Sequence, residues 1–134
     1  MHSCSTAIVA AARRCVGTAF RPQGRVIGIG LDCVGVALIA ARAAGTGIEP
    51  PRYTLGGDHH DRLDAVLAAQ GCTVVAEAQP GDLLVVAPAA GARHLGVVTD
   101  AGLIHAHAGL GRVVEAPADP AWTIVAAWRL PEHD

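Results

Sequence analysis

The feature that most constrains the fold of this chain is a change in its apolar period near residue 72. Upstream, apolar residues recur at the three- and four-residue intervals of helices, whereas downstream they alternate with polar residues as in strands. Helices followed by strands indicate an α+β domain in which N-terminal helices pack on a C-terminal antiparallel sheet. A chain of 134 residues without an internal repeat suits one domain, so we expect a single domain over residues 1–134.

Cap and turn signals divide the chain into elements. Three helices are expected, over residues 5–17, 32–44 and 59–70, with Ser5 and Asp32 as caps of the first two. The second helix is apolar nearly all round, which predicts burial on most sides. The glycine-rich segment 18–31 is expected to be a wrapping loop, and residues 45–58 a connection. The five to six strands of the sheet are expected at residues 73–76, 82–87, 94–99, 103–107, 112–115 and 123–128.

Composition argues against several classes of protein. Hydrophobic residues make up 51% of the chain and charged residues 16%, so the chain can bury a core instead of remaining disordered. Its cationic residues form no basic stripe, which argues against nucleic-acid binding. No apolar stretch reaches the roughly 18 residues of a membrane span, so we expect no membrane insertion. Residues 7–12 are too short for a signal-peptide core, and we expect synthesis in the cytoplasm without a signal peptide.

Cys33 is the expected nucleophile because it directly follows the Asp32 cap. Free backbone N–H groups in the first turn of a helix carry partial positive charge, which stabilises a thiolate and lowers the pKa of the thiol. The same N–H groups can hold the oxyanion of a tetrahedral intermediate. The alternative is a buried structural cysteine that happens to begin a helix.

A hairpin over residues 94–107, turning near residues 100–102, supplies the candidate base. A loop of two or four residues places His94, His105 and His107 on one face and the apolar residues between them in the core. A three-residue loop without a bulge would separate His94 from the other two. We expect the even loop, which gives Cys33 a base, His94, with a second histidine to orient its ring. Gly96 beside His94 is expected to leave room for the cysteine helix.

Two other interpretations of the histidines stay open. His105 and His107 could lie on a solvated strand face without any chemical role. Three histidines and a cysteine also resemble a zinc set, to which the run Asp58-His-His-Asp could add ligands. No familiar ligand spacing such as HExxH is present, so we expect neither a metal nor another cofactor.

Five blocks of the sequence resemble, in order and spacing, those of the NlpC-type cell-wall cysteine peptidases. The blocks are Val16-Gly-Thr-Ala-Phe-Arg-Pro-Gln-Gly, Gly30-Leu-Asp-Cys-Val-Gly, Pro80-Gly-Asp-Leu, His94-Leu-Gly-Val-Val and Leu103-Ile-His-Ala. They run from the first helix to the C-terminal strands. The resemblance implies a papain-like core that cleaves peptide-stem amide bonds of peptidoglycan, typically the γ-D-glutamyl–diaminopimelate bond.

The resemblance also implies roles for single residues. Cys33 is the nucleophile, His94 the base and His105 the third polar residue. In an even hairpin, however, His107 lies directly opposite His94, and opposed residues are closer than diagonal ones, so His107 remains the substitute. Contacts to the oxyanion or the substrate are expected from Cys33, Phe20, Asp32, Gln23 and His107.

The block Arg21-Pro-Gln-Gly, followed by a Gly-x-Gly approach to the cysteine, resembles a subgroup that phages and gene transfer agents encode with their tail genes. It implies tail-tip or hub proteins as partners and a place in a phage-like particle. Two positions depart from the family: Phe20 stands for the usual tyrosine and cannot donate a hydrogen bond, and Val34 stands for a frequent serine. The alternatives are a structural tail-tip component with reduced or lost activity, and an acyl-transfer enzyme acting on another amide.

Overall fold

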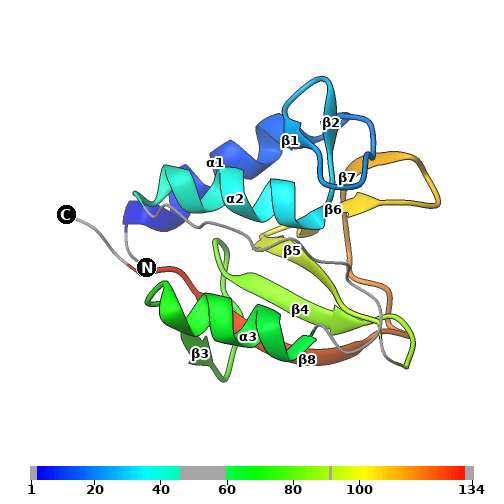
Figure 1. The fold of residues 1–134 in the computed structure, drawn as a ribbon. Helices are drawn as coiled ribbons and strands as arrows, with labels where there is room; N and C mark the ends of the chain where they lie inside the picture. The colour runs from blue at the N-terminus through cyan, green and yellow to red at the C-terminus, as the bar shows by residue number, and fades with distance from the viewer. Residues whose placement is uncertain (1–2, 46–59, 91, 132–134) are drawn as a thin grey trace.

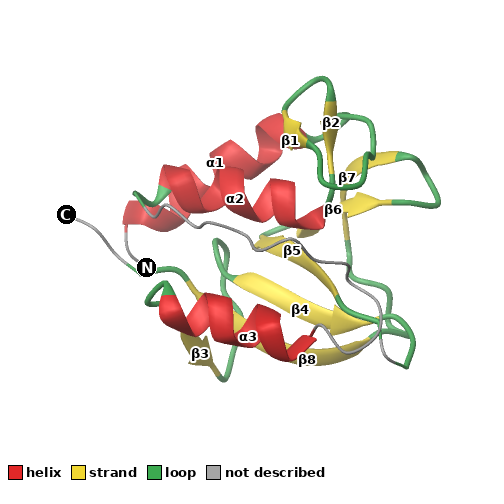
Figure 2. Ribbon diagram, in the orientation of Figure 1, coloured by secondary structure: helices red, strands yellow, loops and turns green. Residues whose placement is uncertain are grey.

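The architecture is an antiparallel sheet with helices packed against it (Figures 1 and 2). A computed structural model describes residues 3–45, 60–90 and 92–131. Within these residues the main sheet has six strands in the order β3-β8-β4-β5-β6-β7. The strands are β3 (Thr73–Val75), β4 (Leu83–Ala87), β5 (His94–Thr99), β6 (Gly102–His107), β7 (Arg112–Ala116) and β8 (Thr123–Arg129). The predicted α+β class and antiparallel sheet are confirmed.

The main hydrophobic core lies between one face of the sheet and three helices. These are α1 (Ser3–Cys15), α2 (Cys33–Ala43) and α3 (His60–Ala69). Along β4, Leu83 and Val85 enter this core, whereas Leu84 and Val86 join a smaller apolar cluster on the opposite face. α2 packs against α1 and β5 and is buried along most of its length, as its apolar sequence predicts. None of the helices in the described part of the chain is long and apolar enough to cross a membrane.

Two expectations for the N-terminal third are wrong. α1 begins at Ser3, so Ser5 lies inside the helix instead of capping it; Ser5 is buried against the turn at Gly81. The segment 18–31 is not only a loop, because β1 (Arg25–Val26) and β2 (Gly30–Leu31) pair as a short antiparallel hairpin. The third expected helix is present as α3, and most of the expected connection over residues 45–58 lies outside the described residues.

A buried carboxylate joins the Pro80-Gly-Asp turn to the C-terminal strand. Asp82 is 2% exposed and accepts two hydrogen bonds from Arg129, from Nε at 3.0 Å and from Nη2 at 2.9 Å. It also accepts the backbone N–H of Gln79 at 2.7 Å. Such a two-pronged pairing fixes geometry as well as charge. This block of the sequence therefore has a structural role, holding the start of β4 against β8.

Candidate active site

Cys33 is the first residue of α2 and is held there by a capped turn. Asp32 has an extended backbone with φ −107° and ψ −175°, and its side-chain Oδ1 accepts the N–H of Gly35 at 2.8 Å. Asp32 is therefore the cap that the sequence predicts. Cys33 itself is 2% exposed, which places the thiol below the surface at the head of the helix.

The Asp32 carboxylate also holds the segment that precedes it. Its Oδ2 accepts the backbone N–H of Gln23 at 2.7 Å, and its Oδ1 accepts Nη1 of Arg25 at 2.9 Å. Gln23 has φ 60°, a left-handed conformation that is unfavourable for a residue with a side chain. One carboxylate thus joins the start of α2 to a locally strained turn. This turn belongs to the segment of residues 20–25, which forms one wall of the site and is called the wall below.

The same wall lies directly against α2 through a backbone contact. A Cβ atom at Gly35 would collide with the carbonyl oxygen of Gly24. Gly35 belongs to the first turn of α2, two residues after the cysteine. The glycine after Val34 in this block is therefore required for the close approach of the wall to the helix.

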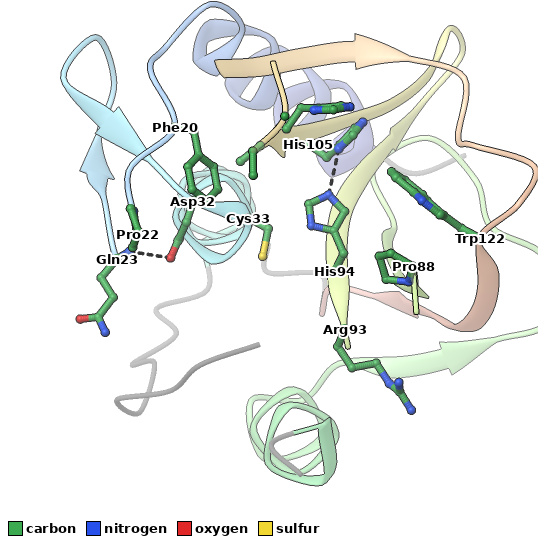
Figure 3. Close-up of a pocket in the computed structure, with 14 residues that line it drawn as sticks. Phe20, Pro22, Gln23, Asp32, Cys33, Pro88, Arg93, His94, His105 and Trp122 are labelled. Carbon is green, nitrogen blue, oxygen red and sulfur yellow. Dashed lines mark hydrogen bonds between the residues drawn. The ribbon is translucent and has the colours of Figure 1, made fainter. Parts of the chain in front are cut away.

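His94 and His105 meet through the hairpin of β5 and β6. Thr99 pairs with Gly102, so the connecting loop has two residues, and the predicted even register is confirmed. Nε2 of His94 lies 2.8 Å from Nδ1 of His105, a hydrogen bond that Figure 3 shows. The hairpin therefore gives His94 a histidine neighbour, as its spacing in the sequence predicts.

The diagonal histidine, not the directly opposed one, contacts His94. The paired register of β5 and β6 ends at Val97 and Ile104, so His94 lies beyond the paired part of the strands. His107 instead accepts the backbone N–H of Leu110 at Nδ1, at 3.0 Å. The geometry thus joins His105 to His94 and turns the Nδ1 atom of His107 toward its own turn.

The bond between the two rings restricts where their protons lie. If Nδ1 of His94 is to accept a proton, the proton that His94 already carries must lie on Nε2 and be donated to Nδ1 of His105. A neutral His105 then carries its own proton on Nε2. In this arrangement His105 orients the ring of His94 and stabilises the cation that forms when His94 is protonated.

Trp122 covers both rings and was not among the residues predicted for the site. Its ring centroid is 5.5 Å from that of His94, with an angle of 71° between the planes, and 5.3 Å from that of His105, at 85°. These are edge-to-face contacts. Its backbone N–H donates to the carbonyl of Asp119 at 3.0 Å in the turn before β8. The sequence feature that could have pointed to Trp122 is its rarity: it is one of two tryptophans in the chain, and it lies just outside an expected strand.

Both members of the proposed nucleophile–base pair are neutral at pH 7. Burial raises the pKa of the Cys33 thiol to about 12, although the backbone N–H groups of Leu95, Val34 and Cys33 act to lower it. Burial, with the neighbouring histidines, lowers the pKa of His94 to about 4. The expectation of a lowered thiol pKa is therefore wrong: the helix start acts in the predicted direction, but the lost hydration has the larger effect.

The Trp122→Ala substitution is expected to raise the pKa of His94, because it admits water to a ring whose pKa is lowered by burial. In the unchanged protein this ring is expected to titrate near pH 4. A histidine in the unfolded chain titrates at about pH 6.5. Protonation of His94 therefore favours unfolding, and the free energy of unfolding should decrease as the pH falls below that value. Nitrogen NMR of the imidazole rings measures the midpoint, and Trp122→Phe should keep it near the original value. An unmoved midpoint in Trp122→Ala would show that the indole does not control the hydration of the ring.

The side chains predicted for the site line one cavity of about 520 Å³ (Figure 3). They are Phe20, Gln23, Asp32, Cys33, His94, His105 and His107. Arg93 and Trp122 also line it and were not predicted. No hydrogen bond joins Cys33 to His94 within the described residues, so proton transfer between them requires a side-chain movement or a bridging water in this shared space. The distance between a nucleophile and its base commonly shortens when a substrate binds.

The zinc interpretation concerns the same histidines and Cys33. Among those that the structure describes, no three His, Cys, Asp or Glu residues are grouped so that they could hold a metal ion. Nε2 of His94 and Nδ1 of His105 are engaged with each other. The run Asp58-His-His-Asp, named as a source of further ligands, lies outside the described side chains.

Comparison with known proteins places this arrangement in a structural context. No protein-family model matches the chain, and no curated protein matches it in sequence. Its fold is similar to that of NlpC2 from Trichomonas vaginalis, with a TM-score of 0.68 and 15% sequence identity. The similarity covers 94% of this chain and 46% of that protein, so the chain spans less than half the length of this structural neighbour. The chain therefore has an NlpC-type α+β fold.

Proposed function

We propose that this protein is a cysteine peptidase in which Cys33 is the nucleophile and His94 the general base. The observation that carries the proposal is that the thiol at the head of α2 and the hydrogen-bonded pair His94–His105 line one cavity. A nucleophile, a base and a group that orients the base are the parts that covalent acyl transfer needs. The NlpC-type fold supports the assignment.

The neutral resting state favours a general-base mechanism. Nδ1 of His94 takes the proton of the Cys33 thiol as the sulfur forms its bond to the substrate carbonyl carbon. The carbonyl oxygen becomes an oxyanion, which the backbone N–H groups at the start of α2 can stabilise. His105 accepts the Nε2–H of the His94 cation throughout.

The reaction is completed in two further steps. His94 returns the proton to the leaving amine, the C–N bond breaks, and the acyl group remains on the sulfur as a thioester. A water molecule then gives a proton to His94 and attacks the thioester carbonyl. The C–S bond breaks, the carboxylic acid is released, and His94 returns its proton to the sulfur of Cys33.

We propose the peptide stem of bacterial peptidoglycan as the substrate and the γ-D-glutamyl–diaminopimelate linkage as the bond. Five blocks of sequence support this choice through their resemblance to cell-wall peptidases. The cavity volume of about 520 Å³ is in the range of pockets for small ligands, which suits a short stem peptide. The block Arg21-Pro-Gln-Gly supports a setting in the tail of a phage-like particle, with tail-tip or hub proteins as partners.

A second candidate is a structural tail-tip protein that has kept this fold and uses little or none of the chemistry. Phe20 favours it, because this residue lines the cavity and brings no hydroxyl to a substrate or oxyanion. Loss of one such donor costs on the order of 100-fold in rate in other enzymes. The two candidates differ in whether any bond is cut.

Incubation with purified peptidoglycan sacculi tests the proposal. The protein is expected to release new amino groups with time, because each hydrolysed amide frees one amine. Labelling of free amines measures the rate, and mass spectrometry of the soluble fragments identifies the bond. Heat-denatured protein provides the background. A rate equal to this background would favour the structural candidate, and fragments cut at another amide would replace the proposed bond.

A further inference from the structure

The charged side chains of the cavity differ in how they are compensated. Apart from histidines, the described lining residues include two, Asp32 and Arg93. The Asp32 carboxylate accepts Nη1 of Arg25 and two backbone N–H groups, so the protein itself compensates its charge. Arg93 donates from Nη1 to the carbonyl of Ala92 at 2.9 Å, and no carboxylate contacts it in the described part of the chain.

Arg93 is placed beside the proposed base, on the other side of the strand. It directly precedes β5, which begins at His94, and neighbouring residues of an extended chain point in opposite directions. Figure 3 shows the imidazole and the guanidinium leaving the backbone on opposite sides. Leu95, which shares the alternation of Arg93, packs with α2 in the main core. Arg93 therefore lines the cavity from the side of the strand opposite His94, and Figure 3 shows its side chain extending away from Cys33.

The surroundings of Arg93 favour an anionic ligand. Phe20, Pro22, Pro88 and Trp122 form apolar parts of the same lining, and Arg93 is itself partly buried. In surroundings of reduced polarity the attraction between opposite charges is stronger than in water. A guanidinium whose remaining N–H groups are available matches the two oxygens of a carboxylate.

We propose that Arg93 binds a free carboxylate of a substrate whose scissile amide lies in the same cavity. The site then selects γ-glutamyl linkages with a free α-carboxylate over those in which this group is amidated. The inference rests on the proposed function and narrows its substrate class. A γ-linked glutamyl residue carries its α-carboxylate as a branch close to the scissile carbonyl, and an ordinary peptide bond does not. Amidation removes the charge and leaves the shape almost unchanged.

Two synthetic peptides test this selectivity. L-Ala-γ-D-Glu-diaminopimelate and the corresponding D-isoglutamine peptide differ only in this carboxylate. The unchanged protein is expected to cleave the acid with a kcat/KM about 10-fold or more above that of the amide, which corresponds to one hydrogen-bonded ionic contact. Arg93→Gln should bring the ratio to about one by slowing cleavage of the acid alone, and Arg93→Lys should keep part of it. Arg42→Gln is the matched control, because it removes an exposed arginine at the other end of α2.

Binding to the Cys33→Ala protein, measured by calorimetry, separates this inference from the peptidase proposal. Suppose that the unchanged protein cuts neither peptide, but the Cys33→Ala protein binds the acid peptide about 10-fold more tightly than the amide peptide. The carboxylate subsite then stands and the peptidase proposal fails. Equal cleavage of both peptides, or a ratio that Arg93→Gln leaves unchanged, overturns the role of Arg93 and leaves the peptidase in place. If the protein neither cleaves nor binds either peptide, both the peptidase proposal and the role of Arg93 are wrong.

Discussion

Replacing Cys33 with alanine is expected to lower the cleavage of stem peptides by at least about 10⁴-fold, to the background of the assay. Cys33 is the only cysteine among the described residues that line the cavity, so nothing there can take over formation of the thioester. Alanine favours the helix and removes only a small buried side chain, so the fold should persist. The rate of amine release from the synthetic acid peptide measures the loss, and circular dichroism checks the fold.

Cys72→Ala is the matched control for that substitution. Cys72 is also buried, at 5% exposure, but it lies in the main core and not among the lining residues of the cavity. Its loss should leave the rate of cleavage close to that of the unchanged protein. If folded Cys33→Ala protein cleaved the peptide as fast as Cys72→Ala protein, Cys33 could not be the nucleophile.

Replacing His94 with alanine is expected to lower kcat by about 10³-fold, because general-base catalysis contributes roughly 10²–10⁴-fold. The loss is expected to be large because burial keeps the pKa of the Cys33 thiol near 12, so little thiolate forms without a base. Added imidazole should restore part of the rate by entering the space that the side chain leaves. Single-turnover cleavage of the acid peptide, with and without imidazole, measures both effects.

The His94 assignment would be wrong if the alanine variant kept more than about a tenth of the original rate without imidazole. His94→Gln provides a second variant for the case in which the cavity of the alanine variant collapses. It keeps most of the volume and polarity of the ring but cannot accept a proton at neutral pH. It should therefore be as slow as His94→Ala and should not respond to imidazole.

The sequence could predict what depends on neighbours along the chain. The cap at Asp32 and the course of α2 follow from residue types within one helical turn of each other. The contact between His94 and a second histidine follows from counting residues through one hairpin, because the loop length sets which side chains share a face. The six expected strands of the main sheet begin and end within one residue of the observed ones for the same reason.

Contacts between distant segments could not be obtained in this way. Trp122 reaches His94 because β8 lies beside β4, and no local pattern specifies that neighbourhood. Gly96 was expected to make room for the cysteine helix, and that expectation is wrong. A Cβ atom at Gly96 would lie 2.7 Å from the carbonyl oxygen of Ile104, so the glycine accommodates the adjacent strand β6.

The pKa of Cys33 shows a second limit of the same kind. Its position at a helix start indicates the direction in which nearby N–H groups act on the thiol. How much water the sulfur loses depends on α2, β5 and the wall together, which only the packed structure reveals. The sequence therefore predicted the smaller of the two effects correctly and the net direction wrongly.

The attachment of the cavity wall to α2 has a consequence for how such a site diversifies. Backbone groups hold part of the wall, because the Gly24 carbonyl lies against Gly35 and Gln23 is bound through its main-chain N–H, and the Arg25 side chain adds an ion pair with Asp32. The side chain of Gln23 is exposed, whereas that of Phe20 packs partly buried against the main core. Mutations of exposed side chains of the wall can change which ligand is preferred while the backbone contacts stay intact. Recognition can therefore evolve at a small cost in protein stability.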